Sequence, residues 1–158
     1  MLAFVLSALI GVAPALPPSF VGPKGWVEKK PPPDEVDAIW LSPHFGVNGN
    51  GENLTVASHP TSPGATLASE IHDAISSISQ DREISGSHAE PTCAGRQPGW
   101  SFDGRLPIPN GVTVEQIYHI ALLNGRTYVF TFTHAAGQRV DPAITQSIQS
   151  ICPLPTTP

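Results

Sequence analysis

The sequence carries little charge. Charged residues make up 13% of its 158 residues, about half of the share that a soluble domain usually has. Eight Lys and Arg against thirteen Asp and Glu leave a formal net charge of −5, and the basic residues form no cluster. Because nucleic-acid binding needs clustered cations that contact phosphates, the composition argues against a nucleic-acid partner. Eighteen prolines and fourteen glycines also exclude a long coiled coil.

Long apolar runs are missing as well, apart from a short one at the N-terminus. Residues 2–12 are mostly apolar and are followed by Ala13-Pro14-Ala15, which fits an A-x-A cleavage site. This run is too short to span a bilayer as a helix, and no later segment is suited to a membrane span. We therefore expect a signal peptide over residues 1–15 and a secreted or periplasmic mature chain. No Lys or Arg precedes the run, so a buried N-terminal helix or a misplaced start codon remain as alternatives.

Cysteine is scarce too, with only Cys93 and Cys152 in the chain. Their separation matches no metal-binding motif and no C-x-x-C redox motif. An exported domain with an even number of cysteines most simply pairs them, so we expect a Cys93–Cys152 disulfide. Closing a loop of about 60 residues would stabilise the fold by about 4 kcal/mol before strain is subtracted. The alternative is two separate buried thiols in a cytosolic protein.

The remaining sequence predicts an antiparallel α+β domain. Hydrophobic periodicity and turn residues indicate seven strands and two helices, the second helix beginning at Asp141-Pro142 with an N-cap Asp and a Pro at the first helical position. We expect a sheet of six to seven strands packed against both helices. The domain boundaries are a loosely held Pro-rich segment at 16–24, one α+β domain at 25–152 and a disordered tail at 153–158. The predicted elements are strands at 25–29, 38–42, 52–58, 83–89, 100–106, 112–123 and 126–134, and helices at 66–79 and from 141.

The strongest local signal is a hairpin centred on Asn124-Gly125. This dipeptide favours a two-residue turn in which both residues have positive φ. The resulting register places Glu115 opposite His134 and one apolar face toward the core. The opposite face is only half apolar, and we expect another element to cover part of it. The core face carries Ile117, Ala121, Leu123, Tyr128, Phe130 and Phe132.

No residue pattern in the chain indicates catalysis, a metal or a cofactor. The six histidines show no metal-binding spacing, and we interpret them as surface or satisfied side chains. Gly99-Trp100-Ser101-Phe102-Asp103 resembles G-x-S-x-G, but the last position is Asp and the segment is a predicted strand, not a strand-to-helix elbow. One alternative stays open, a small hydrolase or metal-dependent enzyme whose site is assembled from distant residues. Its candidate residues are His88, Ser101, Asp103 and His119.

Three segments resemble the PsbP/Mog1-like superfamily. Phe20-Val21-Gly22-Pro23-Lys24-Gly25-Trp26 is similar to its F-x-x-P-x-G-W opening, and Glu52-Asn53-Leu54-Thr55-Val56 to the strand before its first helix. Residues 126–132 resemble a late strand of the same family. The cysteine pair departs from the PsbP pattern. As a group these proteins are non-catalytic, so the resemblance implies a sheet-and-helix sandwich and a tendency to bind partners.

Together these observations predict a non-catalytic binding or accessory protein of the cell envelope. It would act through a protein or small-ligand interaction surface, with an envelope protein as the expected partner and with no cofactor. A related possibility is a stabilising subunit that stays bound in an envelope complex.

Overall fold

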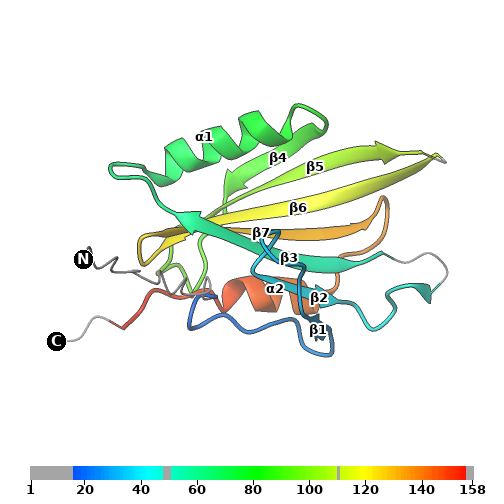
Figure 1. Cartoon of the computed structure of the whole chain (residues 1–158), viewed down its shortest axis with the longest axis horizontal. Helices are drawn as coiled ribbons and strands as arrows, with labels where there is room; N and C mark the ends of the chain where they lie inside the picture. Colours follow the sequence, from blue (N-terminus) through cyan, green and yellow to red (C-terminus); the bar gives the residue numbers. More distant parts are fainter. Residues whose placement is uncertain (1–15, 48–50, 110, 156–158) are drawn as a thin grey trace, which may run out of the picture.

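The computed structural model describes residues 16–47, 51–109 and 111–155, and the predicted signal peptide lies outside them. These residues form a seven-stranded sheet in the order β1-β2-β3-β7-β6-β5-β4, and all neighbouring strands are antiparallel. Figure 1 shows α1 and α2 on opposite sides of this sheet. The predicted α+β sandwich is therefore confirmed. The elements are β1 (Val27–Lys29), β2 (Ala38–Leu41), β3 (Asn53–Pro60), α1 (Leu67–Ile78), β4 (Glu83–Ala89), β5 (Trp100–Ile108), β6 (Val112–Leu123), β7 (Arg126–Ala135) and α2 (Pro142–Gln149).

The β6–β7 hairpin has the predicted turn and register. Asn124 and Gly125 have φ of 53° and 72°, the left-handed conformation that a tight hairpin turn requires. Leu123 pairs with Arg126, and Glu115 pairs with His134. Because side chains alternate along a strand, this register fixes which residues of both strands face each helix.

One face of the sheet packs against α2. The α2 residues Ile144 and Ile148 join Leu54, Phe130 and Phe132 in the larger core cluster. Asp141 caps the helix by accepting a hydrogen bond from the Ala143 amide at 2.9 Å. Its other carboxylate oxygen accepts one from the Trp26 indole, also at 2.9 Å, which joins the N-terminal segment to the start of α2.

The other face of the sheet packs against α1. This helix is the element that covers the half-apolar face of the hairpin. Thr66 caps α1 and forms a reciprocal capping box with Ser69. The apolar stripe of the helix lies on Phe102, Tyr118 and Ile120, with further sheet residues at the edge of the cluster. The helix residues in this cluster are Leu67, Ile71, Ala74, Ile75 and Ile78.

The prediction of a loosely held segment at 16–24 is wrong. Ser147 donates to the Val21 carbonyl, and the Val21 amide donates to Ser150 at the end of α2. The Phe20 ring packs 5.4 Å from Trp40 and 5.0 Å from Phe130, measured between ring centroids. Side-chain packing and backbone hydrogen bonds therefore hold this segment against the core.

Strand ends differ from prediction for identifiable reasons. β1 begins late because the Trp26 amide closes a turn onto the Pro23 carbonyl at 3.1 Å. β5 continues through Pro107 to Ile108, while pairing with β4 on its other side ends at Arg105. Pro107 has no backbone N–H to donate, but it lies beyond the residues of β5 that pair with β4. No hydrogen bond between β5 and β4 is therefore lost.

Candidate functional site

A small cavity lies between the sheet and α2. Its volume is about 100 Å³, which holds about four or five non-hydrogen atoms at the packing density of protein interiors. Most of its wall is apolar, and four polar residues are present. The lining residues are Leu54, Glu90, Ser101, Ile117, His119, Phe130, Phe132, Val140, Ile144, Thr145 and Ile148.

Three of the polar residues form one hydrogen-bonded group. The Ser101 hydroxyl lies 3.0 Å from Nδ1 of His119 and donates to the Glu90 carboxylate. The same Glu90 oxygen lies 3.6 Å from His119 Nδ1. Ser101 and His119 are 1% and 2% exposed. Nε2 of His119 is the one fully buried side-chain nitrogen or oxygen in the described part of the chain that has no hydrogen-bond partner.

The strand register brings these residues together. Ser101 on β5 pairs directly with His119 on β6, so both side chains emerge on the same face. Gly99 allows the imidazole to lie over β5, because a Cβ there would come within 2.6 Å of the ring and 2.7 Å of the Glu90 carbonyl. Glu90 follows β4, and its amide donates to the Gly99 carbonyl at 3.0 Å.

The electrostatics of the group favour an ionised Glu90. The His119 side chain, whose Nδ1 lies 3.6 Å from the carboxylate, is the main cause that lowers the pKa of Glu90 to about 2, against the opposing effect of burial. Smaller contributions come from the Ser101 hydroxyl and from the charges of His119 and His88. Glu90 is therefore a carboxylate at any physiological pH, and it accepts a hydrogen bond from Ser101.

A second, more polar pocket of about 260 Å³ adjoins the cavity. Ile117 and Val140 line both spaces. Glu115 lies 3.5 Å from Arg105 and 3.9 Å from His134. Burial is the main cause that raises the pKa of Asp103 above its usual value, and the nearby Glu115 charge adds to it. The remaining lining residues are Ser85, Gln116 and Gln138.

The buried group does not have the geometry of a catalytic triad. In a Ser-His-Asp triad the nucleophile and the acid contact different ring nitrogens, so the ring can accept a proton on one side while held on the other. Here both Ser101 and Glu90 lie on the Nδ1 side of His119. Ser101 donates a hydrogen bond to Glu90 instead of to the ring, and its side chain is 1% exposed.

Of the four residues in the hydrolase alternative, the structure brings two together. Ser101 and His119 are in contact at 3.0 Å, whereas Asp103 lines the second pocket. His88 is exposed and bonds to the Gly86 carbonyl through Nδ1. The interpretation of the histidines as surface or satisfied side chains is wrong for His119, which is buried and has an unpartnered nitrogen. Glu90 was missed, because no sequence pattern links it to Ser101 or His119.

Neither a metal cluster nor a membrane-spanning helix emerges from the described residues. They contain no group of three or more His, Cys, Asp or Glu side chains placed to hold a metal ion. None of the helices in that part of the chain is both long enough and apolar enough to cross a bilayer. The structure does contain the disulfide between Cys93 and Cys152, whose Cα atoms are 5.0 Å apart.

Comparison with solved structures identifies the fold. The chain superposes on cyanobacterial PsbP (CyanoP) from Synechocystis sp. PCC 6803 with a TM-score of 0.56 and 16% identity, covering 84% of this chain and 81% of that one. The chain has the PsbP-like fold. LpqN, involved in cell envelope biogenesis of Mycobacterium tuberculosis, also superposes, with a TM-score of 0.51, 14% identity and coverage of 83% and 75%. No family model matches the sequence, and no curated protein matches it. The resemblance noted in the sequence is thus confirmed at the level of the PsbP-like fold.

Proposed function

We propose that this PsbP-like protein is a non-catalytic accessory protein of the cell envelope that binds a small ligand in the cavity beneath α2. The observation that carries this proposal is the orphaned His119 Nε2, a buried polar atom of a residue that lines this mostly apolar cavity. Leaving such an atom without a partner costs about 1–3 kcal/mol, and a ligand in the cavity would supply the missing hydrogen bond.

The cavity defines the chemical class of the ligand. Its volume admits an apolar group of about four or five non-hydrogen atoms, and Nε2 of His119 requires one hydrogen-bonding atom in that group. A larger molecule could extend past Ile117 and Val140 into the polar pocket. A ligand of four or five non-hydrogen atoms gains at most about 6–7.5 kcal/mol of binding free energy, and a larger ligand that also fills the second pocket could gain more.

Pyrazole is a suitable probe because it has five ring atoms and can donate to or accept from Nε2. At ten times its dissociation constant, a ligand that binds only the folded state stabilises it by about 1.4 kcal/mol, which raises the melting temperature by about 3–5 °C for a chain of this length. We expect this rise in the unmodified protein. Ile144→Phe fills the cavity and should abolish the rise, whereas Ile78→Phe on α1, on the opposite face, should retain it.

A melting temperature that pyrazole leaves unchanged would contradict the proposal, as would an equal rise in Ile144→Phe. The competing hydrolase function rests on the contact between Ser101 and His119. Hydrolysis of p-nitrophenyl acetate that is lost in Ser101→Ala would favour that function instead.

The envelope location is a proposal with three supports. They are the apolar run ending in Ala13-Pro14-Ala15, the disulfide and the shared fold of LpqN, a protein involved in cell envelope biogenesis. An envelope protein partner is proposed on the same grounds. Intact mass of the protein from the envelope fraction should correspond to a chain that starts at Leu16. A full-length mass with two free thiols would contradict export.

A further inference from the structure

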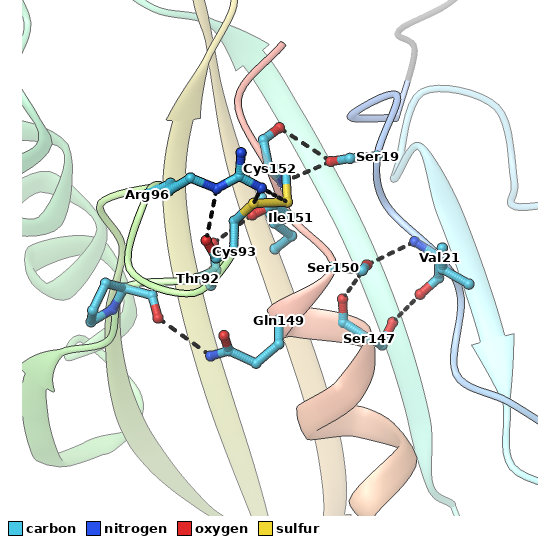
Figure 2. The surroundings of a disulfide bond; sticks show 11 residues. Ser19, Val21, Thr92, Cys93, Arg96, Ser147, Gln149, Ser150, Ile151 and Cys152 are labelled. Atoms are coloured by element: carbon cyan, nitrogen blue, oxygen red, sulfur yellow. Dashed lines mark hydrogen bonds between the residues drawn. A yellow bond between two sulfur atoms is a disulfide. The ribbon is translucent and has the colours of Figure 1, made fainter. Parts of the chain in front are cut away.

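The disulfide between Cys93 and Cys152 has an unusual cationic neighbour. The Arg96 guanidinium places Nη2 at 2.8 Å from Sγ of Cys93 and 3.9 Å from Sγ of Cys152, and Figure 2 shows it lying against the bridge. Its Nε donates to the Cys93 carbonyl at 3.3 Å. No ion pair of Arg96 occurs among the residues that the structure describes, so no carboxylate there neutralises its charge.

The two sulfurs differ in access and in electrostatic environment. Cys93 is 4% exposed, whereas Cys152 is partly exposed near the end of the described chain. A guanidinium beside a sulfur stabilises the thiolate over the thiol. In thiol–disulfide exchange the sulfur that leaves as the better-stabilised thiolate leaves faster. Cys93 is therefore the favoured leaving group, and Cys152 is the sulfur that an incoming thiolate can reach.

We propose that Cys152 is a site of reversible mixed-disulfide formation with a small-molecule thiol. The incoming thiolate attacks Cys152 Sγ, a new S–S bond forms there, and the Cys93–Cys152 bond breaks. The bonding electrons leave with Cys93 as a thiolate beside Arg96. The attacking thiol is the co-reactant and becomes covalently bound. No net oxidation occurs, because one disulfide replaces another.

The surrounding hydrogen bonds keep this exchange reversible. Ser19 bonds to both the amide and the carbonyl of Cys152, at 2.7 and 3.1 Å. The Cys93 amide donates to Gln149, and the Thr92 hydroxyl donates to the Ile151 carbonyl at 2.7 Å. These contacts do not involve sulfur, as Figure 2 also shows. They hold the two cysteines close after the bridge opens, so the Cys93 thiolate can displace the bound thiol.

The loop that carries Cys93 is shaped for this position of Arg96. Cys93, Ala94 and Gly95 have φ of 55°, 53° and 84°, three successive residues in the left-handed conformation. A bridge between Thr92 and Gln97 closes the loop. The two non-glycine residues adopt a conformation that is unfavourable by itself, so their positions depend on the surrounding contacts. The tight loop turns Arg96 back over the sulfur three residues before it.

The test measures the site and the rate of exchange with reduced glutathione. Oxidised protein is incubated with glutathione, quenched with N-ethylmaleimide and mapped by peptide mass spectrometry. We expect glutathione on Cys152 and N-ethylmaleimide on Cys93. Glutathione found on Cys93 instead, or distributed equally between the two, would overturn the proposal. This measurement uses the unmodified chain and therefore does not depend on the folding of a variant.

A variant series tests the role of Arg96. Loss of a charge-assisted contact to the leaving thiolate should slow exchange in Arg96→Gln by at least about fivefold. Arg96→Lys keeps the charge and should recover part of the rate. Arg139→Gln, which removes an exposed arginine from the segment before α2, should react like the unmodified protein. An unchanged or faster rate in Arg96→Gln would contradict the assignment.

Discussion

Replacing Glu90 by Gln tests the electrostatics of the buried group. The pKa of Glu90 falls from 4.5 to about 2 in the folded protein, which corresponds to roughly 3 kcal/mol at 1.36 kcal/mol per unit. The Glu90 side chain is 34% exposed, so solvent screening reduces this figure to about 1–2 kcal/mol. Glu90→Gln should therefore lower the free energy of unfolding by about 1–2 kcal/mol at pH 7.

The pH dependence of this loss has a definite sign. Because the pKa of Glu90 is lower in the folded state, the unfolded chain binds more protons than the folded one between about pH 4.5 and pH 2. The stabilisation is thus fully present above pH 4.5 and is lost as the pH falls toward 2. Urea unfolding curves of both proteins should differ at pH 7 and converge near pH 2.

Glu83→Gln is the matched control, because Glu83 is exposed on the edge strand β4. It should change the free energy of unfolding by less than about 0.5 kcal/mol at either pH. Equal stability of Glu90→Gln and the unmodified protein at pH 7 would contradict this prediction. A difference between them that is the same at pH 7 and pH 2 would contradict it as well.

Three further predictions concern the site and the core. Gly99→Ala places a Cβ 2.6 Å from the His119 ring and should lower the free energy of unfolding, measured with urea, by about 1–3 kcal/mol. An unchanged free energy of unfolding would show that the ring does not lie over β5. Asp141→Ala removes the α2 cap and the bond from Trp26, and should lower the free energy of unfolding by about 1–2 kcal/mol. Burial raises the pKa of Tyr118, so absorbance at 295 nm should show its phenol ionising above pH 10. Ionisation of this phenol at the usual pH of a tyrosine would contradict its placement under α1.

Local sequence patterns were sufficient to predict the sheet around the hairpin. Asn124-Gly125 fixed the turn, and the alternation on either side fixed the register and the core face. The apolar stripe of α1 and the Asp141 cap of α2 were equally local features. Each of these elements is specified by residues within a few positions of one another, which is why the sequence alone was informative.

The buried polar group was not predictable in this way. Position 119 lies between Ile117 and Ala121, so the alternation already placed His119 on the core face. That inward position was the available signal, since a histidine among core residues needs polar partners. Its partner Ser101 becomes adjacent only through the β5–β6 pairing, and Glu90 only through the chain's path after β4. The firm attachment of residues 16–24 was missed for a similar reason, because its partners lie at the far end of the chain.

The most direct test of the account is a long-range ¹H–¹⁵N NMR spectrum of the His119 ring, recorded with and without pyrazole. Nδ1 lies 3.0 Å from the Ser101 hydroxyl and 3.6 Å from the Glu90 carboxylate, and Nε2 is the nitrogen without a partner. Pyrazole should shift the Nε2 resonance saturably and move Nδ1 much less, and Ile144→Phe should suppress the shift. If neither nitrogen responds, or if the response persists when the cavity is filled, His119 does not hold a ligand in the space beneath α2.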